Sequence, residues 1–203
     1  MIQRKPLLLV ATGPTAGQFA FGPFRGVADV MAVSDAWRLC DFVDYIYACD
    51  YDWWKYHGPS LMSHPAKKYS LDVDVEPRHP LCAYLTNLGR RGFSFCEGHV
   101  FSGHNSGYQS LQLAATMGYT TIYLVGFDMG ATGHTHFFGD HPPPIRHYSD
   151  YDSFISDFAH AAPVIESRLT VELLTQPSGL SHLFKYRSPA NALARCKEIG
   201  RLG

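Results

Sequence analysis

The chain has 203 residues and is 46% hydrophobic, which is enough to bury one core and predicts a single domain. A formal net charge of −1 excludes a broad basic field for sequence-independent nucleic-acid binding, so nucleic acid is not an expected partner. Five cysteines without a C-x-x-C pair argue against a disulfide framework and a thiolate zinc site, and no stretch approaches the roughly 18 apolar residues of a membrane span. These features predict a soluble, cytoplasmic protein.

The first predicted strand covers residues 7–11 and runs into a glycine turn, TGPTAG, at residues 12–17. A buried strand that delivers a glycine turn to the edge of a sheet is typical of nucleotide-binding α/β domains. The turn matches neither G-x-G-x-x-G nor a Walker sequence, so a tight turn without a ligand is the alternative. Gly13 and Thr15 are the candidate nucleotide- or phosphate-binding residues of this turn.

Two further predicted strands, residues 30–33 and 45–49, are followed by polar side chains, Asp35 and Asp50. Because the carboxyl ends of neighbouring parallel strands meet at one edge of a sheet, we expect these side chains to share a crevice and bind the same ligand. Asp50 and Asp52 form a D-x-D pair whose carboxylates could hold Mg²⁺ or Mn²⁺ beside a diphosphate.

The clearest unit in the sequence runs from Asn105 to Asp128, where a helical pattern from residue 108 is followed by a buried strand at residues 120–125. The first N–H groups of a helix have no intrahelical partner, and Asn105, Ser106 and Gly107 leave room for a phosphate to approach them. Asp128 lies just beyond the strand, where open α/β sheets bind ligands. In the alternative interpretation, Ser106 only caps the helix and Asp128 only closes a turn.

The remaining segments complete an alternation of strands and helices. We predict a loop-rich stretch with one strand near residues 69–75, a short strand at 93–95, a helix at 149–162 closed by Pro163, a last strand at 169–175 and a C-terminal helix at 188–199. This order predicts an α/β class with a mainly parallel sheet.

The loop at residues 129–150 is rich in histidine and proline. It contains His134, His136, Asp140, His141 and His147. Their spacing fits no closed metal motif, so we interpret the loop as a lid that supplies a general base, either His141 or His147. A true metal centre and ordinary surface histidines are the alternatives.

The segment HNSGYQSLQLAATMGYTTIYLVGFDM, with the Gly13-Pro14 turn, resembles a Rossmann-like superfamily that includes bacterial sialyltransferases of the Campylobacter type and hydroxymethylpterin diphosphokinase-like enzymes. The HFFGDHP segment resembles that of a group of phage and prophage proteins. The resemblance implies a cytidine nucleotide site and a loop histidine that acts as base without a metal. The residues it implicates in ligand binding are Gly13, Asp35, Asp50, Asn105, Ser106, Gly107 and Asp128.

The leading functional hypothesis is a transferase that uses a nucleotide-linked or diphosphate donor, most specifically a sialyltransferase-like glycosyltransferase. His147 or His141 would take the acceptor proton, and Asp35 and Asp128 would contact ribose or the acceptor. The pair Asp50 and Asp52 leaves Mg²⁺ or Mn²⁺ open as a cofactor. Two other classes remain as alternatives: a non-catalytic phage accessory protein that keeps a nucleotide-type pocket, and a metal-dependent hydrolase using the histidine loop. The acceptor is unspecified, and a homo-oligomer is compatible with the sequence.

Overall fold

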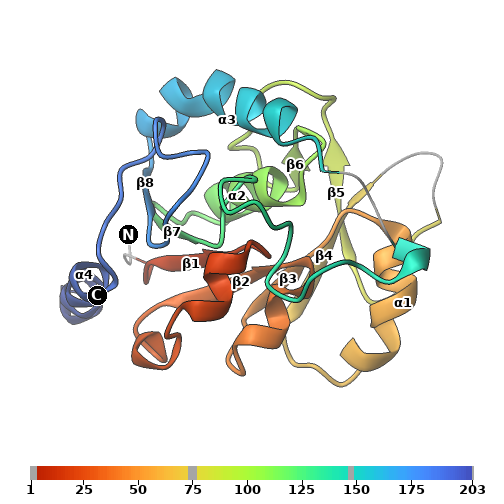
Figure 1. Ribbon diagram of the computed structural model, residues 1–203, viewed down its shortest axis with the longest axis horizontal. Coiled ribbons are helices and arrows are strands. Elements are labelled where there is room, and N and C mark those ends of the chain that lie inside the picture. The colour runs from red at the N-terminus through yellow and green to blue at the C-terminus, as the bar shows by residue number, and fades with distance from the viewer. Residues whose placement is uncertain (1–3, 73–76, 146–148, 203) are drawn as a thin grey trace.

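The architecture is a three-layer α/β/α sandwich (Figure 1), seen in a computed structural model that describes residues 4–72, 77–145 and 149–202. Within these ranges an eight-stranded sheet has the order β6-β5-β4-β3-β2-β1-β7-β8, and every neighbouring pair is parallel. The strands are β1 (Leu7–Val10), β2 (Asp29–Val33), β3 (Tyr45–Tyr47), β4 (Lys67–Asp72), β5 (Ala83–Asn87), β6 (His99–Val100), β7 (Thr121–Val125) and β8 (Thr170–Leu173).

Helices cover both faces of the sheet. The α-helices are α1 (Tyr51–Leu61), α2 (Ser106–Thr116), α3 (Tyr151–Glu166) and α4 (Pro189–Leu202), and short 3₁₀ turns occur at η1 (Pro14–Gln18), η2 (Gly22–Phe24), η3 (Ser34–Leu39) and η4 (Pro143–Ile145). Figure 1 shows α2 and α3 over one face and α1 and α4 on the other. Sheets covered on both faces are built from continuous apolar strands, and β1 is buried at all four positions.

Alternate side chains of β1 serve the two hydrophobic cores. Leu7 and Leu9 pack in the core under α2 and α3, while Leu8 and Val10 pack in the core that holds Trp54 of α1. This period of two is what a pleated strand imposes. Because both faces of β1 are buried, a shift of this strand by one residue would move every side chain into the wrong core. The position of its carboxyl end is therefore fixed.

The strand order reverses direction at β1. The chain proceeds outward from β1 through β2 to β6 and then returns to β7 on the other side of β1, so that Val10 is paired with both Ala32 and Val125. In open α/β sheets such a reversal leaves a crevice outside the carboxyl ends of the two strands. The fold therefore predicts a ligand site beside residues 11–13 and 126–129.

Most predicted elements are confirmed, and three predictions are corrected. No strand forms at residues 93–95, where the Ser94 N–H donates to the Gln112 side chain of α2 at 3.1 Å and not to a neighbouring strand, and the next strand is β6. The stretch 58–92 is more regular than predicted, since it contains β5 and the end of the unpredicted helix α1. Pro163 does not close α3, because its ring lies on the exposed face while the next turn buries Ile165.

The predicted strand near residues 69–75 is β4, with residues 73–75 outside the described ranges. No helix in the described ranges is long and apolar enough to cross a bilayer.

Candidate functional site

A cavity of about 340 Å³ lies at the carboxyl edge of the sheet, at the reversal point between β1 and β7. Its walls come from the segments that follow β1, β2, β3 and β7, from the start of α2 and from the start of α3. Part of the predicted lid, including His136 and His141, forms a further wall. In Figure 1 the segment between β7 and α3 passes in front of the sheet. Residues of the predicted lid therefore lie beside the cavity, and their role as a lid stays a prediction.

Unusual backbone conformations gather around this cavity. Ser34, His104 and Met129 are the non-glycine residues with positive φ in the described part of the chain, with φ values of 48°, 48° and 50°. All three line the cavity. Left-handed backbone costs an L-residue roughly 1 kcal/mol or more, and such strain concentrates at binding and catalytic sites. The clustering makes this cavity the candidate functional site.

The turns after β1 and β7 are joined by Asp128. Its carboxylate accepts hydrogen bonds from the Thr15 main-chain N–H, at 2.9 Å, and from the Thr15 hydroxyl. Gly13 N–H donates to the Gly126 carbonyl at 3.0 Å, and a Cβ on Gly13 would lie 2.6 Å from the Asp128 carboxyl carbon. Burial raises the pKa of Asp128. Gly13 and Asp128 line the cavity as predicted, whereas Thr15 is turned away from it to hold Asp128.

The start of α2 presents main-chain donors to the cavity. Asn105 is the N-cap, because its side-chain oxygen accepts the Tyr108 N–H at 2.8 Å, so the alternative that Ser106 caps the helix is wrong. The Ser106 hydroxyl instead accepts from Cys49 N–H at 3.2 Å and lies 3.1 Å from the Cys49 sulfur. Ser106 and Gly107 line the cavity, and helix geometry leaves their N–H groups without an intrahelical partner.

Asp35 lies beneath the cavity and does not line it, contrary to the prediction that it contacts the ligand. The left-handed turn at Ser34 sends Ser34 to the cavity and buries Asp35 in η3, where its side chain is 2% exposed. There the carboxylate accepts from Trp53 Nε1 at 2.8 Å and from Arg38 at 3.3 Å, and His57 Nε2 lies 3.5 Å away. Asp35 is thus a buried anion surrounded by donors.

Two histidines of the predicted lid lie between the Asp35 carboxylate and the cavity. His141 Nδ1 lies 3.8 Å from the Asp35 carboxylate, and the His136 ring lies 4.6 Å from the His141 ring. His136 is in turn held by Thr12, with Nδ1 2.9 Å from the threonine hydroxyl. Burial, aided by His141, lowers the pKa of His136 to about 4, so this imidazole is neutral near pH 7. The other predicted base, His147, falls outside the described residues.

The predicted metal pair does not converge. Asp50 lines the cavity as the N-cap position of α1, but Asp52 lies on the exposed surface of that helix, because α1 begins directly after Asp50. In the described ranges, no group of three or more His, Cys, Asp or Glu side chains is placed to hold a metal ion. The histidines of the loop do not gather at one point either, since His134 is exposed and does not line the cavity that His136 and His141 line.

The sequence analysis did not select several of the cavity residues. They are Thr12, Ser34, Cys49, His104 and Tyr151, while His136 was named in the histidine loop but not as the base. Thr12 and His104 each precede a selected residue by one position, so their place in the turn was a usable signal. Ser34 was not detectable, because a positive φ at a serine has no signature in the sequence.

The sheet topology and the position of the cavity define a Rossmann-like α/β domain, and solved sialyltransferase structures share this fold. Sialyltransferase CstII from Campylobacter jejuni with cytidine-5'-monophosphate has a TM-score of 0.59 and 12% identity, covering 91% of this chain and 85% of that one. The same enzyme with the substrate analogue CMP-3FNeuAc has a TM-score of 0.58 and 12% identity, covering 90% and 86%. At this identity the likeness establishes the fold alone. No protein-family model matches the chain, and no curated protein matches it significantly.

Proposed function

We propose that the protein transfers a glycosyl group from a nucleotide-linked donor bound in this cavity. The observation that carries the proposal is the cavity at the strand-order reversal of a Rossmann-like sheet, ringed by three strained non-glycine residues. Structures that share the fold contain CMP or CMP-3FNeuAc, which makes a CMP-linked sugar the first donor to test.

The donor phosphate is assigned to the start of α2. Main-chain N–H groups at a helix N-terminus stabilise a bound phosphate through hydrogen bonds and the helix dipole. Ser106 and Gly107 supply these groups, and the absence of a side chain on Gly107 lets this turn pack against Asn105 and Phe127, which a Cβ would meet at 2.9 Å. Asn105 satisfies the third N–H of the first turn, so the other donors stay available to the ligand.

His141 is assigned as the general base. It lines the cavity and has the buried Asp35 carboxylate behind it, 3.8 Å from Nδ1. A carboxylate in that position orients the imidazole and stabilises the imidazolium formed when the opposite nitrogen takes a proton. His136 suits this task less well, because a pKa of about 4 makes it a weak base near neutral pH.

The acceptor hydroxyl gives its proton to His141 while its oxygen forms a bond to the anomeric carbon of the donor. The bond between that carbon and the phosphate oxygen breaks, and the nucleotide leaves with the electron pair. The N–H groups of Ser106 and Gly107 stabilise the negative charge that develops on the departing phosphate.

Nucleotide release tests the proposal. The protein is incubated with CMP-, UDP- and GDP-linked sugars, each with and without Mn²⁺, and free nucleotide is followed over time. One donor should be consumed, and His141→Gln should slow its consumption about 100-fold without weakening nucleotide binding. The matched control is His160→Gln, since His160 is exposed on α3. Nucleotide binding without turnover of any donor would instead favour a non-catalytic binding protein.

A further inference from the structure

Two adjacent arginines, Arg90 and Arg91, lie beside one buried carboxylate near the cavity. Arg90 Nε is 3.8 Å from one oxygen of Asp157, and Arg91 Nε is 3.9 Å from the other. The Asp157 side chain is 3% exposed, whereas the arginine side chains are 43% and 66% exposed. A buried carboxylate needs a cationic partner, but one guanidinium would neutralise it. The pair therefore leaves one positive charge at the surface.

Most N–H donors of the two guanidinium groups have no hydrogen-bond partner among the described residues. Both contacts with Asp157 are longer than a hydrogen bond, and the Asp157 Oδ2 atom has no hydrogen-bond partner in the described residues. Arg90 donates one hydrogen bond, at 3.0 Å, to the Ser153 hydroxyl of α3. Each guanidinium has five N–H groups in a planar fork that matches a carboxylate or phosphate. The ion pairs with Asp157 and the hydrogen bond to Ser153 position the arginines, and most of their N–H groups stay available to a ligand.

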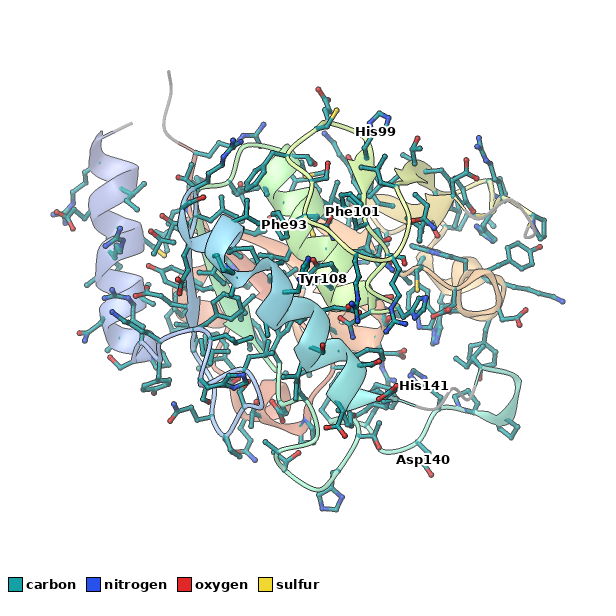
Figure 2. All side chains as sticks on the ribbon, turned by 90° about the horizontal axis from the view of Figure 1, so that it is seen from above. Phe93, His99, Phe101, Tyr108, Asp140 and His141 are labelled. Atoms are coloured by element: carbon teal, nitrogen blue, oxygen red, sulfur yellow. The ribbon has the colours of Figure 1, made fainter. Side chains whose placement is uncertain are left out.

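The loop that carries the arginines is rigidly supported. The Tyr108 hydroxyl donates to the Gly92 carbonyl at 2.6 Å, and the rings of Phe93 and Tyr108 are 6.1 Å apart. A Cβ on Gly92 would meet the Phe101 ring at 2.6 Å. Figure 2 shows Phe93, Phe101 and Tyr108 close together. The arginines therefore project from a loop that is fixed against α2, which favours a preformed binding site.

The same loop is connected to two walls of the cavity. Gly103 N–H donates to the Arg90 carbonyl at 3.0 Å, and the next residue, His104, lines the cavity. On the other side, Ser153 lies between Tyr151 and Phe154 of α3, and both of these line the cavity. Arg90 thus lies close to the cavity rim, where residues 103–104 and the start of α3 meet.

We propose that Arg90 and Arg91 form an anion-binding subsite for the acceptor, which is a saccharide carrying a carboxylate or phosphate group. This inference rests on the proposed function and adds the substrate class. The donor phosphate is already assigned to the start of α2, so the surplus positive charge at the rim is free for the second substrate. Two guanidinium forks of this kind select an anionic sugar over its neutral counterpart.

The test uses matched probes that differ only in charge. Binding of galacturonic acid and galactose, and of glucose 6-phosphate and glucose, is measured by NMR titration, and CMP is titrated separately. At least one acid should bind about tenfold tighter than its neutral partner, and comparison of the two acids distinguishes carboxylate from phosphate recognition. Arg91→Gln should reduce that preference several-fold and leave CMP binding unchanged. The control is Arg25→Gln, because Arg25 is an exposed arginine paired with exposed Asp41 away from the cavity.

Removal of both arginines would leave Asp157 buried and unpaired, so a second variant removes all three charges: Arg90→Gln, Arg91→Gln and Asp157→Asn. This variant should fold and show no preference for the acids. Equal binding of acidic and neutral probes by the wild type, or a preference that survives in the triple variant, would overturn the inference. If the acids bind through the arginines while CMP does not bind, the anion site stands and the proposed function fails.

Discussion

Asp35 gives the sharpest test of how the site works, because its sequence position suggested ligand contact whereas its side chain lies beneath the cavity. The change Asp35→Asn keeps the shape and keeps an oxygen for Trp53 Nε1, which now lies 2.8 Å from the carboxylate. It removes the charge that faces Arg38 and the two histidines. Since Arg38 is 47% exposed and its contact is 3.3 Å long, we expect a loss of only about 1 kcal/mol in the free energy of unfolding.

The effect on turnover should be larger. Without the carboxylate 3.8 Å behind it, His141 loses both its orientation and the charge that stabilises its protonated form. We expect kcat to fall about 100-fold, equivalent to about 2.7 kcal/mol, while the Kd for nucleotide changes by less than about twofold. Asp35→Ala should cost a further 1–3 kcal/mol of stability or so, because Trp53 Nε1 is left buried without an acceptor.

The assays are urea unfolding, nucleotide titration and donor turnover on the same preparations. Asp41→Asn is the matched control, since Asp41 is 79% exposed and pairs with Arg25 on the surface. It should leave all three measurements unchanged. A marked loss of nucleotide affinity in Asp35→Asn would refute the account, because it would place the Asp35 side chain against the ligand. Full turnover in that variant would refute the assigned role of the pair Asp35 and His141.

Three further outcomes are expected. Asn105→Ala should lower the free energy of unfolding by about 1 kcal/mol in urea titrations, since the Tyr108 N–H loses its cap, whereas Asn105→Asp should retain most of it. Gly107→Ala should weaken nucleotide binding and cost about 1–3 kcal/mol of stability, because the new Cβ would lie 2.9 Å from both Asn105 Oδ1 and the Phe127 ring; unchanged affinity would contradict the phosphate assignment. His136 has a folded pKa of about 4, below its ordinary 6.5, so the stability it contributes is complete above pH 6.5 and is lost as the pH falls towards 4, by about 3 kcal/mol at most. Unfolding measured across that range should depend less on pH in His136→Gln than in the wild type.

The parallel sheet could be predicted from the sequence because buried strands have a simple signature. Leu7–Val10 and Thr121–Val125 are continuous apolar or β-branched runs, and both are buried along their whole length. The helix at Ser106–Thr116 follows from its apolar spacing, although its cap is Asn105 and not Ser106. These signals are local, so they survive without knowledge of the tertiary structure.

The side-chain directions could not be predicted in the same way. Asp35, Asp50 and Asp52 all follow strand ends, yet Asp50 alone of the three lines the cavity. Asp35 points into the protein, where it accepts hydrogen bonds from Trp53 and Arg38. Asp52 points outward because it lies on α1, a helix that the sequence did not predict because it contains Gly58 and Pro59. The Trp53 hydrogen bond and the start of α1 decide these orientations, and a strand-end argument contains neither of them.

The central claim is that the start of α2 binds the phosphate of a nucleotide in the cavity at the sheet reversal. A crystal structure of the protein with CMP tests it most directly. The account predicts the phosphate within hydrogen-bonding distance of the Ser106 and Gly107 N–H groups, with His141 facing the open side of the cavity. A nucleotide bound elsewhere on the molecule, or no binding at millimolar CMP, would contradict it.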